Sequence, residues 1–415
     1  MKKIYSSIDI GSDTIKLIVS ELYKNKMNVL ATASVKSKGL KKGLIVDANE
    51  TIISIKEALN EVEGMLGVKV DKVIATVPSY FTDFSLVNGY STVTNEEKEV
   101  RGDDLVRTLQ ASVYNKLPSN RELVSIIPLE FNLDGKIGIR DPRGLVGDKL
   151  GVKALMITSP KKNIYSVVSV IEAAGPEVVD ITVGPICDYY EHKTLETDTS
   201  IGAVVNIGSE TTTVSVFNKG VVVKSEVLQL GGKNIDRDIA YIYKLDRNIC
   251  REIKESFALA HTKVAQVSEV YETTNLIGED VKINQYEVSE VIMARIVEIL
   301  NLVKKQINLL TNQEISYIIV TGGVSEMPGF NFILEDIFGD KAKIGVITTI
   351  GIRNNMYSTA SGIIKYFFEK LKLRGKEYSM FNDDKQRDLV SIKKRLINFS
   401  EDSVLGKVFG FFFES

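Results

Sequence analysis

Two stretches that resemble each other decide the fold: IDIGSDTIKLIV, from Ile8 to Val19, and VNIGSETTTVSV, from Val205 to Val216. In both, a Gly-Ser-acid-Thr core separates two β-branched runs, a pattern that predicts a strand, a tight turn and a second strand. Such a turn presents backbone N–H groups and hydroxyls where no side chain blocks close approach, which suits phosphate oxygens. The sequence therefore predicts two hairpins that face each other and hold the phosphate tail of a nucleotide.

The surroundings of the two turns repeat as well. Each hairpin continues into a third strand and then into a helical pattern, so the chain reads as two halves of one α/β plan. The predicted strands are Ile4–Ile10, Ile15–Val19 and Met27–Val35 in the first half and Gly202–Ile207, Thr211–Phe217 and Val221–Leu230 in the second, and the predicted helices are Glu50–Leu66 and Asn234–Tyr243.

Composition limits the classes of protein to consider. The chain has 415 residues, 44% of them hydrophobic, enough for two or three domains with cores of their own. Its 52 basic and 54 acidic residues nearly cancel, which argues against nucleic acid as the main partner. With only 2 Cys and 2 His, a disulfide framework or a Cys/His metal cluster is not expected. The N-terminus lacks a secretory signal, and we expect a cytosolic protein.

Two other nucleotide motifs do not fit the first hairpin. A P-loop runs from a strand into a helix and ends in Gly-Lys-Ser/Thr, whereas Lys16 follows Ile15 inside a predicted strand. A dinucleotide fold needs GxGxxG at the start of a helix, which this chain does not offer.

A third glycine-rich element follows a buried strand late in the chain. ISYIIVTGGVSEMPGF, from Ile315 to Phe330, ends its apolar run in Gly322-Gly323, and Met327-Pro328-Gly329 marks the start of a helix. Two glycines at the carboxyl end of a central strand let a planar ring lie against bare backbone.

These three elements, in this order, resemble the two phosphate hairpins and the adenosine motif of the actin and sugar-kinase ATPase superfamily. A further segment, REIKESFALA from Arg251, looks like the actin stretch whose Lys-Glu pair touches the nucleoside. The resemblance implies ATP with Mg²⁺ in a cleft between the halves, with Asp9 holding the water shell of the metal. The nucleotide-binding residues it implies are Asp9, Gly11, Ser12, Asp13, Thr14, Lys16, Asn206, Gly208, Ser209, Glu210, Thr211, Thr212, Gly231, Gly232, Lys254, Glu255, Gly322, Gly323 and Met327.

Within this superfamily the chain is most similar to the FtsA family of bacterial cell-division proteins, over nearly its full length. That family lacks subdomain 1B and carries an inserted α+β subdomain 1C, whose signature resembles IIPLEFNLDGKIGIRDPRGLVGDKL. The resemblance implies these divisions: 1–81 and 164–197 for subdomain 1A with a linking helix, 82–163 for 1C, 198–235 and 307–370 for 2A with a closing helix, 236–306 for 2B, 371–400 for a flexible charged tether, and 401–415 for an amphipathic membrane-targeting helix.

The C-terminal sequence SVLGKVFGFFFES has the pattern of an interfacial helix. On a helical wheel its large apolar side chains fall within one broad arc, and partial immersion of half a dozen of them contributes several kcal/mol, enough for reversible anchoring. The predicted membrane-contacting residues are Val404, Leu405, Val408, Phe409, Phe411 and Phe412.

The second hairpin departs from the family pattern. The family usually reads Asp-Ile-Gly-Gly-Gly-Thr, and here Asn206 replaces the aspartate while Glu210 brings a negative charge toward the phosphates. We therefore expect ATP binding with slow or negligible hydrolysis, and we assign no catalytic residue.

The resemblance implies a protein that polymerises and tethers FtsZ to an anionic membrane surface on its cytoplasmic face at the division site. The C-terminal peptide of FtsZ would dock on subdomain 2B. The alternatives are a PilM-type adaptor of pilus assembly, which is itself FtsA-like, and a small-molecule kinase of the same superfamily. A chaperone-type ATPase would need a further domain, and MreB lacks the insert.

Overall fold

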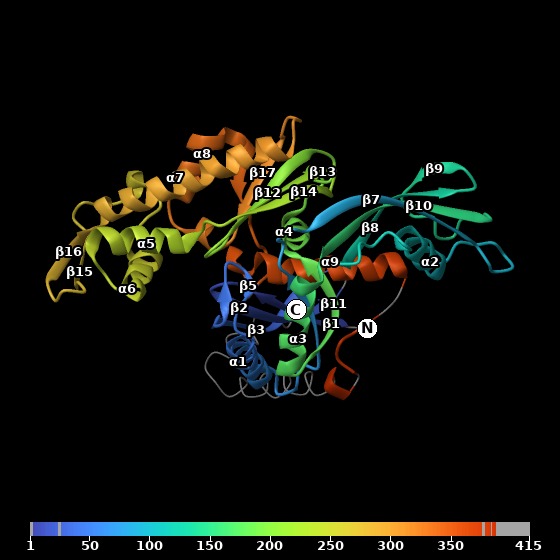
Figure 1. The fold of residues 1–415 in the computed structure, drawn as a ribbon, viewed down its shortest axis with the longest axis horizontal. Helices are drawn as coiled ribbons and strands as arrows, with labels where there is room; N and C mark the ends of the chain where they lie inside the picture. Colours follow the sequence, from blue (N-terminus) through green and yellow to red (C-terminus); the bar gives the residue numbers. More distant parts are fainter. Residues whose placement is uncertain (1–2, 24–25, 376–377, 383, 387–415) are drawn as a thin grey trace, which may run out of the picture.

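The computed structural model describes residues 3–23, 26–375, 378–382 and 384–386. The first half of the chain forms a 5-stranded sheet in the order β11-β6-β1-β2-β3 (Figure 1). β1 pairs antiparallel with β2 and parallel with β6. The strands are β1 (Lys3–Ile10), β2 (Thr14–Tyr23), β3 (Lys26–Lys36), β6 (Lys72–Val77) and β11 (Glu177–Val183).

The second half repeats this topology. Its 5-stranded sheet has the order β14-β13-β12-β17-β18, which corresponds strand for strand to the first sheet read from the opposite edge. Each sheet is an antiparallel meander with two parallel strands added on the far side of its first strand. The predicted duplication is confirmed. The strands are β12 (Ile201–Ile207), β13 (Thr212–Asn218), β14 (Val221–Leu228), β17 (Tyr317–Thr321) and β18 (Ala342–Ile344).

Helices cover both faces of each sheet. α1 (Ala48–Leu66) and α3 (Lys161–Ala174) lie on one face of the first sheet, and α4 (Gly184–His192) and α9 (Ser358–Arg374) lie between the two sheets. α4 and α9 cross in backbone contact: they lie so close that a Cβ at Gly362 would overlap the carbonyl oxygen of Cys187. The outer face of the second sheet carries α5 (Gly232–Tyr243), α7 (Gln285–Leu310) and α8 (Phe330–Phe338).

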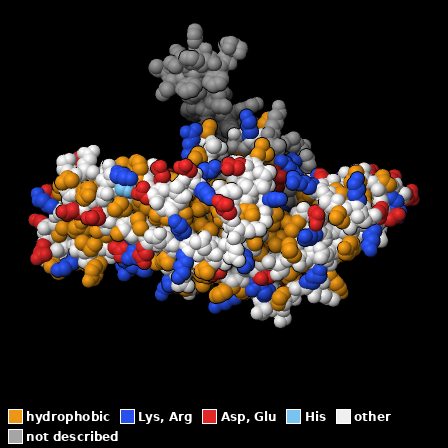
Figure 2. All heavy atoms as spheres, turned by 90° about the horizontal axis from the view of Figure 1, so that it is seen from above, with side chains coloured by type: hydrophobic (Ala, Val, Ile, Leu, Met, Phe, Trp, Pro, Cys, Tyr) orange, Lys and Arg blue, Asp and Glu red, His pale blue; other side chains and the backbone are white. Residues whose placement is uncertain are grey.

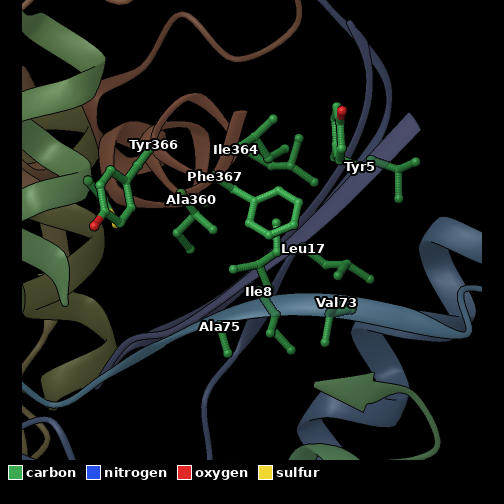
Figure 3. Packing of buried hydrophobic residues seen from close by; sticks show 14 of the residues in the cluster. Tyr5, Ile8, Leu17, Val73, Ala75, Ala360, Ile364, Tyr366 and Phe367 are labelled. Atoms are coloured by element: carbon green, nitrogen blue, oxygen red, sulfur yellow. The ribbon is translucent and has the colours of Figure 1, made fainter. Parts of the chain in front are cut away.

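The burial of side chains follows the strand period of two. Along β12, Val204 belongs to the core shared with the first sheet, whereas Val205 belongs to the core beneath α7. Figure 3 shows the first of these cores, where Phe367 and Ile364 of α9 pack on Ile8 and Leu17. α9 is thereby fixed on the first sheet, and it closes the fold as the sequence predicted.

A separate α+β unit projects from the first half (Figure 1). It is a 4-stranded sheet, β7-β10-β8-β9, with a helix packed on it and a small core of its own. The elements are β7 (Asp83–Thr92), α2 (Gly102–Val113), β8 (Arg121–Leu133), β9 (Lys136–Ile139) and β10 (Lys149–Pro160). They fall inside the predicted insert.

The remaining elements are short. The β4–β5 hairpin lies beside the first phosphate turn, and the β15–β16 hairpin lies at the far end of the second half (Figure 1). Their bounds are β4 (Leu40–Lys41), β5 (Leu44–Ile45), β15 (Val270–Thr274), β16 (Asp280–Asn284) and, for the helix before β15, α6 (Arg247–Glu252). Within the described part of the chain, no helix is long and apolar enough to cross a membrane.

The segment after α9 corrects one prediction. Residues 371–400 were expected to form a solvated tether, but α9 extends to Arg374, and Met380 and Phe381 are buried against the first sheet. The N–H of Met380 donates to the carbonyl of Ile4 at 3.0 Å. The start of β1 extends beyond its pairing with β6, so its free edge accepts this segment. The sequence did not predict this docking, because Met380 and Phe381 are surrounded by polar residues in the chain.

Acidic and basic side chains are interspersed over the face seen in Figure 2, in keeping with a formal net charge of −2.

Candidate functional site

A cavity of about 590 Å³ lies between the two halves, and residues from both phosphate hairpins line it. Of the nucleotide-binding residues predicted from the sequence, all but Thr212 and Gly231 line this cavity. Thr212 is buried, and its hydroxyl donates to the carbonyl of Leu230 at 2.9 Å. Gly231 lies behind the second hairpin, where a Cβ would come within 2.5 Å of the carbonyl oxygen of Gly208. These two residues support the hairpin from outside the cavity.

The two turns have the same backbone geometry. The N–H of Gly11 donates to the carbonyl of Thr14 at 3.1 Å, and the N–H of Gly208 donates to the carbonyl of Thr211 at 2.9 Å. This shared hydrogen bond leaves the intervening residues, Ser12-Asp13 and Ser209-Glu210, at the cavity.

The acidic residue of each turn reaches across the cleft to the opposite half. Asp13 forms a bidentate ion pair with Arg251 of α6, with N–O distances of 2.9 and 2.8 Å. Glu210 accepts a hydrogen bond from the backbone N–H of Lys42, between β4 and β5, and pairs with Lys233 at 2.9 Å. The sequence had suggested that Glu210 would add negative charge to a phosphate site, but its carboxylate is bound to these two donors.

The floor of the cleft in the first half carries Asp9. Its carboxylate accepts a hydrogen bond from Thr76 at 3.1 Å and lies 3.6 Å from the ammonium of Lys16. Lys16 belongs to β2, and the register of the hairpin places it directly opposite Asp9. A carboxylate and an ammonium thus share the floor beside the first turn.

The floor in the second half carries Asn206, whose side-chain amide donates to Asp188 at 2.8 Å and to Thr359 at 3.2 Å. Asp188 also accepts hydrogen bonds from Ser358 at 2.8 Å and Thr359 at 2.9 Å. Burial raises the pKa of Asp188 to about 6, although the hydrogen bonds from Asn206, Ser358 and Thr359 act in the opposite direction.

The other end of the cavity has bare backbone and two ion pairs. Gly322 and Gly323 follow β17, and Met327 comes just before α8. Lys254 lies in a π-helical turn, Ile253–Phe257, and pairs with Asp236 of α5 at 2.6 Å. Glu255 pairs with Arg251 at 2.9 Å. Lys254 and Glu255, which the resemblance predicted to touch the nucleoside, both line the cavity, and each has an ion-pair partner of its own.

Sequence reasoning missed several residues that line the cavity. Asp236 and Asp188 lie on helices whose sequences gave no signal for these positions, and only the packing of those helices brings them to the cleft. Arg251 opens the segment that resembles actin, which was the one available signal. The lining residues that the sequence did not indicate include Thr76, Tyr80, Asp188, Asp236, Arg251 and Thr359.

The predicted membrane-contacting residues and the predicted metal-binding residue, Asp9, lie in different parts of the chain. The membrane-contacting residues from Val404 to Phe412 lie outside the described residues. Among the described residues, no group of three or more His, Cys, Asp or Glu side chains forms a metal site. Asp9 lines the cavity as a carboxylate, and Mg²⁺ keeps several waters and needs few carboxylates, so the donor set fits a hydrated ion.

Comparison with known proteins identifies the family. The model "Cell division protein FtsA" matches residues 203–362, and the model "SHS2 domain inserted in FTSA" matches residues 83–158, the α+β insert. Cell division protein FtsA of Bacillus subtilis is 30% identical over 378 residues, which cover 90% of this chain and 86% of that protein.

Solved structures match the fold. The PilM–PilN type IV pilus biogenesis complex matches with a TM-score of 0.59 and 18% identity, covering 86% of this chain and 97% of that one. MreB5 of Spiroplasma citri bound to ADP matches with a TM-score of 0.52 and 14% identity, covering 90% of this chain and 98% of that one. These neighbours share the actin-like fold. The sequence relatives identify the family within that fold: the chain belongs to the FtsA family of cell division proteins.

Proposed function

We propose that this protein binds ATP with Mg²⁺ in the cleft between its halves and that, as a filament, it tethers FtsZ to the cytoplasmic face of the membrane at the division site. The observation that carries the nucleotide site is the pair of matching turns on opposite sides of a cavity of about 590 Å³. The buried hydroxyl of Tyr80, in the same cavity, has no hydrogen-bond partner among the described residues, which suits a ligand.

Each part of the cavity fits one part of the nucleotide. The turns after Gly11 and Gly208 offer backbone donors to the phosphates, with Lys16 beside them. Asp9 would hold water molecules of the Mg²⁺, which supplies charge neutralisation to the phosphates when bound. Gly322 and Gly323 would lie against the adenosine. Three hydrogen bonds among Asp188, Asn206 and Thr359 complete the floor, and they occupy the carboxylate of Asp188.

The nucleotide site is tested by titration calorimetry with ATP and Mg²⁺. We expect the unaltered chain to bind ATP and Lys16→Ala to bind about tenfold more weakly or worse, because a buried cation beside the phosphates is lost. Lys224→Ala removes an exposed lysine of β14 that does not line the cavity, and it should bind like the unaltered chain. Equal affinities for all three proteins would refute the site.

The domain assignment and the partners are part of the same proposal. We assign residues 82–163 to subdomain 1C and 236–306 to subdomain 2B, where the acidic C-terminal peptide of FtsZ would dock. A groove on 2B combines Arg237 and Arg247 with the exposed side chains of Tyr241 and Leu276, which suits a peptide with acidic and apolar residues. Arg247→Glu should weaken binding of that peptide, whereas Lys224→Glu on the neighbouring subdomain should not.

The membrane anchor is tested by co-sedimentation with anionic liposomes. We compare the full chain with a chain that ends at Ser400, each with and without ATP and Mg²⁺. If only the full chain pellets, and more of it pellets with ATP, the C-terminal segment anchors the protein and assembly depends on nucleotide. If both chains stay in solution, the proposed membrane anchor is wrong, and the alternatives are a PilM-type adaptor of pilus assembly and a small-molecule kinase.

A further inference from the structure

The two halves carry the same turn but different residues at the strand end that precedes it. Asp9 lies near the end of β1, and Asn206 occupies the corresponding place on β12, the matching strand of the second sheet. Both residues line the cavity. The first half therefore presents a carboxylate to the cleft, and the second half presents an amide at the equivalent position.

A carboxylate is nevertheless present behind Asn206. Asp188 projects from α4, lines the same cavity, and accepts a hydrogen bond from the amide of Asn206 at 2.8 Å. Only 2% of Asp188 is exposed, so its charge lies one side chain deeper than that of Asp9. A negative charge is thus present behind the floor of the second half, but it comes from α4, which precedes the second half in the chain.

The contacts of Asp188 hold it rigidly at the place where α4 and α9 cross. The hydroxyls of Ser358 and Thr359, at the start of α9, both donate to one of its oxygens, at 2.8 and 2.9 Å. The other oxygen receives Asn206. Because α4 and α9 are in backbone contact at Gly362, this carboxylate has little room to move.

This arrangement fixes which atom Asn206 presents. Both hydrogen bonds of its side chain, to Asp188 and to Thr359, use the amide nitrogen. The amide oxygen lies on the other side, beside Gly322, where a Cβ would come within 2.5 Å of it. Since Gly322 lines the cavity, the atom of Asn206 on this side is a hydrogen-bond acceptor.

We propose that Asp188 is the positioning residue of the second half: it holds Asn206 with its amide oxygen toward the cleft, and it supplies from one layer deeper the negative charge that Asp9 supplies in the first half. An acceptor oxygen beside a buried carboxylate suits a water molecule of a hydrated Mg²⁺, which donates hydrogen bonds, and does not suit a phosphate oxygen. The inference rests on the proposed ATP site.

The first test separates the metal from the nucleotide. The dissociation constant of ATP is measured by titration calorimetry in Mg²⁺ and in EDTA, for the unaltered chain, Asp188→Asn and Glu191→Gln. Glu191 is a matched control because it is a buried carboxylate of the same helix that pairs with Lys365 at 2.8 Å and does not line the cavity.

We expect Asp188→Asn to reduce the gain in affinity from Mg²⁺ by about tenfold, the usual effect of one lost charged hydrogen bond, and to change the affinity in EDTA less than about twofold. Glu191→Gln should keep the full gain. A purely structural Asp188 would give equal losses in both conditions, or none, and either result overturns the inference. If the unaltered chain binds no ATP at all, the proposed site fails first and the inference fails with it.

The second test needs no nucleotide. Asn206→Asp alone places two carboxylates at the 2.8 Å contact, and we expect it to lower the urea midpoint of the nucleotide-free chain. Adding Asp188→Asn returns one carboxylate and one amide to the pair, so the double variant should recover most of the urea midpoint. A double variant no better than Asn206→Asp would show that the two positions do not act as a pair.

Discussion

The neighbouring glycines at the end of β17 provide a sharp test, because both line the cleft and only one is sterically constrained. Gly322 has a φ of +93°, and a Cβ there would lie 2.5 Å from both the side-chain oxygen of Asn206 and the carbonyl oxygen of Ile207. Gly323 has no heavy atom within 4 Å of such a Cβ. Alanine at the two positions should therefore have very different effects.

The expected magnitude follows from two contributions. A residue with a side chain in this backbone region costs about 1 to 3 kcal/mol. Displacing the carbonyl of Ile207 adds about 1 to 3 kcal/mol, the usual cost of an overpacked site. Gly322→Ala should thus lose about 2 to 6 kcal/mol of unfolding free energy, whereas Gly323→Ala should stay within about 1 kcal/mol of the unaltered chain.

Urea unfolding followed by circular dichroism, without nucleotide, measures both variants. ATP binding is then measured on Gly323→Ala, whose methyl group points into open space beside the proposed adenosine position. We expect this variant to be stable and to bind ATP more weakly. The reasoning is refuted if the two alanine variants unfold at the same urea concentration, or if Gly323→Ala is the less stable of the two.

Three further predictions concern other parts of the molecule. A double-mutant cycle of Arg251→Ala and Asp13→Asn on urea unfolding should give a coupling of about 0.5 to 1 kcal/mol, since both side chains remain partly exposed; strictly additive effects would contradict the cross-cleft pair. Burial lowers the pKa of His192 from 6.5 to about 4, so only the unfolded chain takes up this proton between those values, and stability falls as the pH falls through that window. Between pH 7 and pH 5, the free energy of unfolding should therefore fall by up to about 2 kcal/mol less for His192→Asn than for the unaltered chain. An equal fall in both proteins would contradict the assignment. A chain that ends at Gly375 should be at least about 3 kcal/mol less stable than one that ends at Gln386, because a buried methionine and a buried phenylalanine are removed; equal melting temperatures would show that their docking contributes nothing.

The repeated turn made much of the fold predictable. A Gly-Ser-acid-Thr core between β-branched runs determines a hairpin through local preferences alone, and its second occurrence implied two related sheets. The positions of Gly322 and Gly323 at a strand end also followed from local pattern. These signals depend on neighbours in the sequence, so one sequence was sufficient to read them.

The pairing of side chains across the cleft was not predictable in this way. Asp13 binds Arg251 and Glu210 binds Lys42 because two separate halves meet, and no local pattern records that meeting. The docking of the segment around Met380 on β1 was missed for the same reason, since a free strand edge becomes visible only in the assembled sheet.

The sequence by itself determined the duplicated hairpins, because they depend on periodicity and turn chemistry within a few residues. Its resemblance to a known family supplied the inserted unit and many of the residues that line the cleft. Only the tertiary structure decided what the charged residues do there. The crossing of α4 and α9 places Asp188 behind Asn206, and the position of α6 brings Arg251 to Asp13. Electrostatic roles depend on distances between elements far apart in the chain, and folding alone sets those distances.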